Sequence, residues 1–342
     1  MWWRVLVLGL VGCGRIGFDP IGATSTRMLR LDLVDPHETL ADFPLPVVLD
    51  DARAPRELLD ATASNLRFVD PATGTVLASE LEQVGEPGGL PLVAWVRVPQ
   101  IVGLTTEIEL EVGDDVPPPA TGSVWSSSYE AVYHMTNGAA DATTNHHDGA
   151  AYGGTPAAMP GQLASAQTFS SGACYTIADA ASLDLPELTV SGWVWVSTAP
   201  AAFASIVGRS VTSSNYDDFW LGLHGARQRV EVAVAPTDDI GFDASAIAAG
   251  AWFHLALTAD ADQLTPYVDG VAGNAKPTGA VVEHDPTPIV IAGDEESSPE
   301  PNANYLDGAA DEIRIEHGVR DADWLAYDDA AQRDMVIDYG AP

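Results

Sequence analysis

Apolar and polar residues alternate with a period of two in short runs along most of the chain. Before residue 114 these runs are RMLRLDLVD, LPVVLD, NLRFVD, TGTVLASE, PLVAWVRVP and TEIELEVGD. Clusters of Pro, Gly, Asn and Asp separate them, which is typical of half-buried strands joined by turns. Six such strands predict a small antiparallel β-sandwich over residues 27–113.

The same alternation continues over residues 123–335, for example in LTVSGWVWVS, QRVEVAVA, AWFHLALTAD and ADEIRIEH. Eleven or more short strands predict two packed antiparallel sheets, so we expect an all-β protein with two domains. The segment DDVPPPATG, residues 114–122, predicts a Pro-rich linker, because consecutive prolines cannot pair inside a sheet. One segment, DADWLAYDDAAQRD (321–334), predicts a helix that docks through Trp324 and Leu325.

Charge narrows the choice of partners. The 342 residues include 49 acidic and 15 basic side chains, which gives a formal net charge of −34. A surface this negative repels phosphate backbones, so nucleic acid is not an expected partner. Most of the carboxylates are expected to be a solvated, solubilising surface, and some are candidates for calcium binding.

The stretch VLVLGLVGCGRIGFDP, residues 5–20, supports two interpretations. Its glycine spacing fits a dinucleotide-binding turn, but Pro20 and Gly22 fall where that turn requires a helix. The alternative is an export signal with one positive charge, a short apolar segment and a small residue before Cys13. We therefore expect a signal peptide at residues 1–12 and a tether at residues 13–26, with an ordinary secretory signal as the alternative.

Two resemblances extend this interpretation. Leu10-Val-Gly-Cys13 resembles the bacterial lipobox, which implies that Cys13 carries the lipid and anchors the protein to the cell envelope, at the outer membrane or cell surface. The segments AVYHMTN, LTVSGWVWVS, GAWFHLALTADADQLTPYVDG and LDGAADEIRIEHGVRDADWLAYDD resemble the bacterial laminin-G-like, concanavalin-A-like jelly roll. Residues 27–113 resemble a β-rich domain of unknown function that often precedes such jelly rolls in secreted bacterial proteins.

A calcium site is the best candidate for bound metal. Asp141 and Asn145 in DATTNHHDG and Asp311 in DGAADEIRI supply the oxygen donors that Ca²⁺ prefers. The resemblance implies that this early turn and the late Asp-Glu lie close together, although Thr144 and His146 stand where glycine is often found. The alternative is an Asx-turn at Asp141 and a strand-end Asp311 that binds loop backbone.

Three aromatic residues, Trp193, Trp195 and Trp252, are expected to pack between the two sheets, with sugar stacking by one of them as the alternative. The sequence contains neither the Glu-x-Asp-x-x-Glu strand of β-glucanases nor a Gly-x-Ser-x-Gly elbow. The leading hypothesis is therefore an exported, lipid-anchored, non-catalytic binding or adhesion protein. Its partner would be a glycan or a cell-surface or extracellular protein, and it would meet the membrane only through the lipid. The alternatives are a glycan-cleaving enzyme of the same fold and a purely structural envelope protein.

Overall fold

The computed structural model describes most of the chain after residue 26. The described residues are 27–54, 58–103, 106–113, 116, 122–211, 217–225, 229–234, 237–243, 249–278, 284–295 and 300–339. The predicted signal peptide and tether, with Cys13, lie outside them, as does most of the predicted linker.

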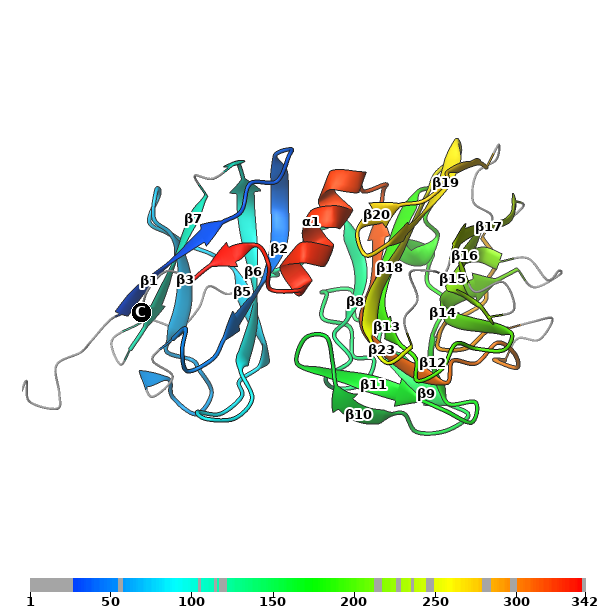
Figure 1. Ribbon diagram of the computed structural model, residues 1–342, viewed down its shortest axis with the longest axis horizontal. Coiled ribbons are helices and arrows are strands. Elements are labelled where there is room, and N and C mark those ends of the chain that lie inside the picture. Colours follow the sequence, from blue (N-terminus) through cyan, green and yellow to red (C-terminus); the bar gives the residue numbers. More distant parts are fainter. Residues whose placement is uncertain are drawn as a thin grey trace, which may run out of the picture.

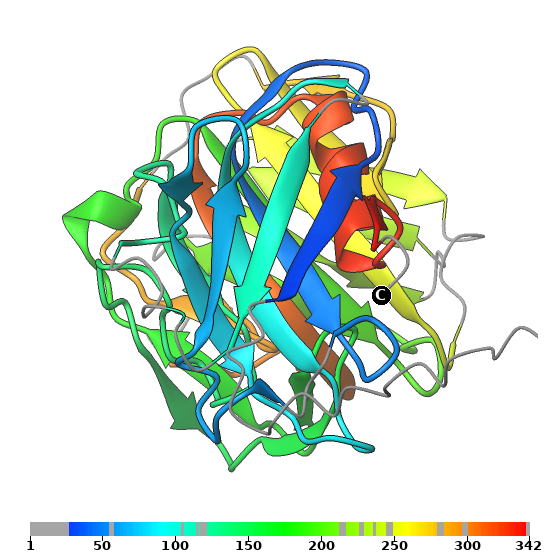
Figure 2. The same ribbon diagram turned by 90° about the vertical axis from the view of Figure 1, so that its left-hand side faces the viewer.

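Two β-sandwiches lie side by side, with one helix, α1 (Ala322–Gln332), where they meet (Figure 1). Figure 2 views the molecule from the first sandwich and shows the second directly behind it. Strands dominate the described residues, and all the pairings are antiparallel, so the prediction of an all-β fold is confirmed. None of the described helices has the length and apolar character needed to cross a membrane.

The first sandwich consists of a five-stranded and a three-stranded sheet. The five-stranded order is β24-β1-β7-β3-β4 and the three-stranded order is β2-β6-β5. Strand β24 comes from the C-terminal end of the chain, so residues beyond the predicted jelly-roll boundary return to the first domain. The bounds are β1 (Arg27–Leu33), β2 (Leu40–Leu49), β3 (Leu66–Asp70), β4 (Thr75–Val76), β5 (Ser79–Gln83), β6 (Leu92–Ile101), β7 (Glu107–Val112) and β24 (Ile337–Asp338).

In the second sandwich, the proximal sheet lies toward the first sandwich in Figure 1, and the distal sheet lies on the far side. The proximal order is β10-β11-β23-β13-β18-β19-β20, with β8 on β23 and β21 on β19. Its bounds are β8 (Tyr129–Tyr133), β10 (Ala157–Pro160), β11 (Ser165–Phe169), β13 (Leu188–Trp195), β18 (Trp252–Ala259), β19 (Gln263–Val268), β20 (Val271–Ala272), β21 (Lys276–Pro277) and β23 (Gly308–His317).

The distal sheet has seven strands in the order β17-β16-β15-β14-β22-β12-β9. Its bounds are β9 (Gly149–Tyr152), β12 (Cys174–Ile177), β14 (Phe203–Ser210), β15 (Asp217–His224), β16 (Arg229–Val234), β17 (Thr237–Asp243) and β22 (Ile289–Ile291). A short 3₁₀ helix, η3 (Ala181–Leu183), follows β12. One apolar core fills the space between the proximal and distal sheets.

Trp193, Trp195 and Trp252 all differ from the expectation, because none of them points between the two sheets. Val194 and Val196 point into the core between the sheets, so Trp193 points to the opposite face of β13. There α1 covers it, and its indole nitrogen donates to the Gln332 side chain at 2.6 Å. Trp193 is buried because α1 forms a further layer, whereas Trp195 and Trp252, opposite each other on the same face, are only partly covered.

Helix α1 begins where the sequence predicts it, because the Asp321 carboxylate caps it by accepting from the Trp324 backbone N–H. Its Trp324 and Leu325 extend the core of the first sandwich, as expected. Strand β6 is buried on both faces: Ala94 and Val96 face that core, while Trp95 packs with Trp125 against the second sandwich. The two sandwiches therefore share a continuous packed interface.

Candidate functional site

The outer face of the distal sheet carries an unusual set of polar and aromatic side chains. In β15, Phe219, Leu221 and Leu223 belong to the core. Because side chains alternate along a strand, Trp220 and His224 point to the outer face.

Trp220 lies flat on this outer face. A Cβ atom at position 222 would overlap the Trp220 ring, so Gly222 provides the space in which the indole rests on the sheet. Phe203, on β14, meets Trp220 edge-on with ring centroids 6.0 Å apart and contacts the His224 ring at 4.3 Å. Phe203 is 40% exposed, so the aromatic group reaches solvent at this end.

A loop after β22 folds back over the same face. Ala292 pairs with Ile206, yet two residues later Asp294 reaches Ser210, near the other end of β14. The Ser210 hydroxyl donates to Asp294 Oδ1 at 2.9 Å, and the Asn304 side-chain amide donates to Oδ2 at 3.0 Å. These bonds hold Asp294, and the adjacent Glu295, over the sheet.

Several polar atoms here are buried without a hydrogen-bond partner. They are the Ser205 hydroxyl, the Trp220 indole nitrogen and both carboxylate oxygens of Glu295. Each of these residues is less than 5% exposed. Burial, followed by the Asp294 charge, raises the pKa of Glu295 to about 7. A buried donor or acceptor without a partner costs about 1–3 kcal/mol, so these atoms are prepared to bond a ligand.

The predicted calcium residue Asp141 is already occupied by hydrogen bonds from its own loop. Its Oδ1 accepts from the backbone N–H groups of Val132 and Thr143, and its Oδ2 accepts from the Thr143 hydroxyl and the His147 backbone N–H. Asn145 is exposed, and its side chain donates to the Glu130 carbonyl at 2.9 Å. This is the Asx-turn arrangement that the sequence left open as the alternative.

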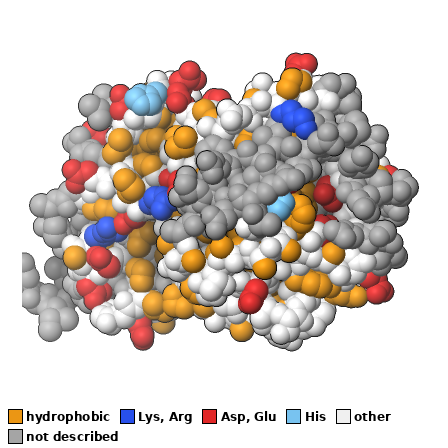
Figure 3. Space-filling view, turned by 45° about the vertical axis from the view of Figure 1, so that its right-hand side comes forward, with side chains coloured by type: hydrophobic (Ala, Val, Ile, Leu, Met, Phe, Trp, Pro, Cys, Tyr) orange, Lys and Arg blue, Asp and Glu red, His pale blue; other side chains and the backbone are white. Residues whose placement is uncertain are grey.

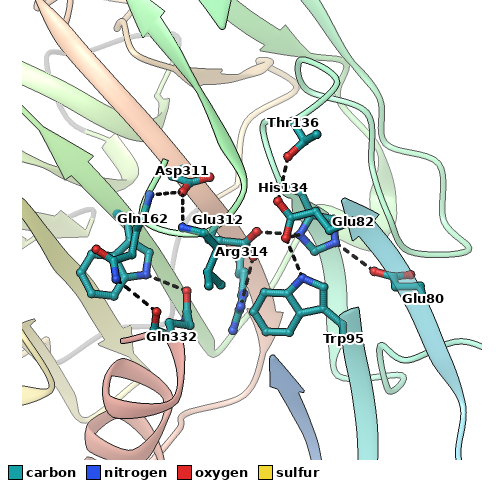
Figure 4. Close-up of polar contacts among 12 residues, drawn as sticks. Glu80, Glu82, Trp95, His134, Thr136, Gln162, Asp311, Glu312, Arg314 and Gln332 are labelled. Carbon is teal, nitrogen blue, oxygen red and sulfur yellow. Dashed lines mark hydrogen bonds and ion pairs between the residues drawn. The ribbon is translucent and has the colours of Figure 1, made fainter. Parts of the chain in front are cut away.

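The third predicted residue, Asp311, lies in β23 and is fully buried. Its Oδ2 accepts from the backbone N–H groups of Gln162 and Leu163 at 2.8 and 3.1 Å (Figure 4). The structure thus gives Asp141 and Asp311 separate loop-binding roles, and calcium at Asp141, Asn145 and Asp311 stays a prediction.

Sequence reasoning did not identify the residues of the distal outer face. The segment FWLGLH predicts a strand. Because it is almost continuously apolar, it does not show which of its residues face outward. Glu295 belongs to an acidic loop, GDEESSPEP, that resembles any solvated turn. The signal that was available is the glycine two positions after Trp220, since a glycine inside a strand often marks the close approach of another group.

Comparison with known proteins agrees with the predicted fold. A family model described as the concanavalin A-like lectin/glucanases superfamily matches residues 169–326, which confirms the prediction of a laminin-G-like jelly roll there. None of the curated proteins compared matches the sequence.

Two solved structures illustrate the similarity. Domain 4 of AbnA, a GH43 extracellular arabinanase from Geobacillus stearothermophilus in complex with arabinotriose, shows 19% identity and a TM-score of 0.45, and the match covers 58% of this chain and 97% of that one. The botulinum neurotoxin serotype D binding domain shows 14% identity and a TM-score of 0.47, over 60% of this chain and 52% of that one. This chain therefore spans about half the length of the neurotoxin domain.

We expect stability to fall with rising pH because of Glu295. Its pKa is higher in the folded protein than its ordinary value of 4.5, so the folded state binds the proton more tightly. This contribution is complete below pH 4.5 and is lost as the pH rises to about 7, by up to about 3 kcal/mol. Urea unfolding at pH 4.5 and 7.5 should show a larger fall for wild type than for Glu295→Gln. Equal falls in the two proteins would contradict the assignment.

Proposed function

We propose that this protein is a non-catalytic glycan-binding protein whose binding site is the outer face of the distal sheet. One observation carries the proposal: the Trp220 indole N–H and the Ser205 hydroxyl beside it are unpartnered, next to the exposed ring of Phe203. The exposed Phe203 ring with these hydrogen-bonding groups nearby matches a sugar ring, which has an apolar face and a rim of hydroxyls. A flat protein surface would not reach these recessed groups.

Charge restricts the class of glycan. The formal net charge is −34, and in the view of Figure 3 acidic side chains are spread over the surface while basic ones are few. Acidic polysaccharides would be repelled. The expected ligand is therefore a neutral glycan, with Glu295 accepting hydrogen bonds from its hydroxyl groups.

Glycan cleavage is the second candidate function. Glu231 pairs with Gly222 and so lies on the same outer face as Glu295, whose raised pKa is suited to a general acid. Two carboxylates are what glycoside hydrolysis requires, and the family description covers both lectins and glucanases. Release of reducing ends from a bound glycan, abolished by Glu295→Gln, would favour this function over simple binding.

The location of the protein is also part of the proposal. Cys13, in the lipobox-like sequence Leu-Val-Gly-Cys, is proposed to carry a lipid that holds the protein at the outer membrane or cell surface. The two sandwiches would then present the distal face away from the membrane anchor. This arrangement suits adhesion or capture of extracellular glycan.

Replacing Trp220 tests the binding site. Trp220→Ala should weaken binding of a neutral glycan, selected on a glycan array with the full-length chain, by about tenfold or more, because it removes the indole N–H and the ring that supports the exposed Phe203. Titration calorimetry with that glycan measures the loss. Trp252→Ala is the matched control, because Trp252 is a partly covered tryptophan on the opposite sheet.

Retained affinity in Trp220→Ala combined with lost affinity in Trp252→Ala would move the site to the proximal sheet. Absence of saturable binding to any glycan would contradict the binding function and favour a structural envelope role.

Replacing Cys13 tests the anchor. Cys13→Ser removes the thiol that would be acylated, so the protein should move from the membrane fraction to the soluble fraction of expressing cells. Fractionation followed by immunoblotting measures this, with Cys174→Ser as control because Cys174 is a buried free thiol. Unchanged membrane association of Cys13→Ser would contradict lipid anchoring.

A further inference from the structure

Three potential metal ligands converge where the two sandwiches meet (Figure 4). Glu82 comes from β5 of the first sandwich, and His134 and Glu312 come from β8's end and β23 of the second. His134 Nδ1 lies 2.7 Å from Glu312 Oε1 and 3.8 Å from Glu82 Oε2. All three ligand atoms lie within 4.8 Å of one another, and among the described residues no other His, Cys, Asp or Glu side chains form such a group.

We propose that Glu82, His134 and Glu312 bind one divalent transition-metal cation that joins the two sandwiches. Ligand atoms about 2.0–2.1 Å from a tetrahedral zinc ion lie roughly 3.3 Å apart, which falls between the two separations measured from Nδ1. The imidazole nitrogen favours Zn²⁺ or a similar ion over Ca²⁺, which takes oxygen ligands. In the metal-free protein His134 Nδ1 contacts Glu312 Oε1 directly at 2.7 Å.

The surroundings hold the three ligands in place. His134 Nε2 bonds Glu80 Oε1 at 2.9 Å, and the Trp125 indole N–H donates to the same oxygen at 2.8 Å. This carboxylate fixes the ring so that Nδ1 faces the other ligands, as carboxylates do for metal-binding histidines.

Glu82 is held in the same way. The Thr136 hydroxyl donates to Glu82 Oε1 at 2.7 Å, and the Trp95 indole N–H donates to Oε2 at 3.0 Å. Each carboxylate oxygen keeps a second lone pair, so these bonds orient the ligand without occupying it fully.

Carboxyl groups at the cluster outnumber basic side chains. The basic side chains are His134 and Arg314, and the carboxyl groups are Glu80, Glu82, Asp311, Glu312 and Asp328. Burial and the neighbouring carboxylates raise the pKa of Glu82 to about 7 and that of Asp311 well above its ordinary value. Burying carboxylates without counter-charges is costly. A dication in place of one proton reduces this imbalance.

A bulge in β23 adds an independent observation. Between the pairs Ser191–Arg314 and Trp193–Asp311, β23 has one residue more than β13. The consecutive side chains of Asp311 and Glu312 therefore project from the same face of the strand. Asp311 Oδ1 is buried and has no hydrogen-bond partner. In Figure 4 this oxygen points away from Gln162, toward the side where the ligands lie. It is available to bond a water molecule on the metal.

An opening leads to the cluster. A cavity of about 210 Å³ is lined by Glu80, Glu82, His134 and Thr136, together with the turn that follows them. This cavity gives a cation and its bound water a path to the ligands. A metal site that was closed off inside the interface would have no such path.

Metal titration of the full-length protein tests the proposal. After treatment with chelator, Zn²⁺ should bind with a stoichiometry of one per chain in titration calorimetry and raise the melting temperature. Glu82→Gln and Glu312→Gln should each weaken binding at least a hundredfold, and Glu80→Gln about tenfold. Co²⁺ in place of Zn²⁺ should give wild type the visible absorption bands of a tetrahedral site.

His147→Gln is the matched control, because His147 is a histidine in the loop after β8 whose ring bonds the exposed Ser182 hydroxyl, away from the three ligands. It should bind Zn²⁺ like wild type. Circular dichroism establishes that each variant is folded. The Co²⁺ spectrum of the wild-type protein tests the metal site without any substitution. Absence of saturable binding to wild type, or equal binding in folded Glu82→Gln and Glu312→Gln, would overturn the proposal. Loss of binding in His147→Gln alone would also overturn it.

Discussion

The burial of one charged side chain, Arg314, sets the arrangement of the whole molecule. Its guanidinium carbon lies 4.7 Å from the centre of the Trp95 ring and 5.2 Å from that of Trp125, and the side chain is about 1% exposed. A buried cation costs several kcal/mol unless it is paired and bonded, and here Asp328 accepts at 2.9 Å and Glu312 at 3.2 Å. Its partners come from β6, β23 and α1, so separating the sandwiches would leave the charge without its environment.

Because the junction around Arg314 holds the first sandwich against one sheet, the two outer faces of the jelly roll have different surroundings. The first sandwich and α1 cover the proximal sheet, where Trp193 is held by Gln332, while the distal sheet lies on the far side (Figure 1). Trp193 on the proximal face thus serves packing, whereas Trp220 on the distal face belongs to the proposed glycan site. The two faces also differ in chemistry, since ion pairs such as Arg314–Asp328 lie at the proximal junction, whereas the neutral groups of Ser205 and Trp220 lie on the distal face.

Local patterns predicted the strands and the helix, but not how the layers face one another. The run PLVAWVRVP is almost continuously apolar, and the structure shows the reason: β6 packs on both faces. Trp193 was assigned to the wrong face because the sequence does not show that α1 adds a layer. Glu82 and His134 are 52 residues apart and belong to different domains, so neither motif nor spacing joins them. The contact forms at the junction where Arg314 packs on Trp95 and Trp125.

The central claim is that the junction makes the two sandwiches one cooperative unit. Differential scanning calorimetry of the full-length protein tests it most directly. A single transition is predicted, with a calorimetric enthalpy equal to the van 't Hoff enthalpy, because neither sandwich can unfold without exposing Arg314 and its partners. Two separate transitions, each with its own midpoint, would show that the sandwiches unfold independently and would contradict this account.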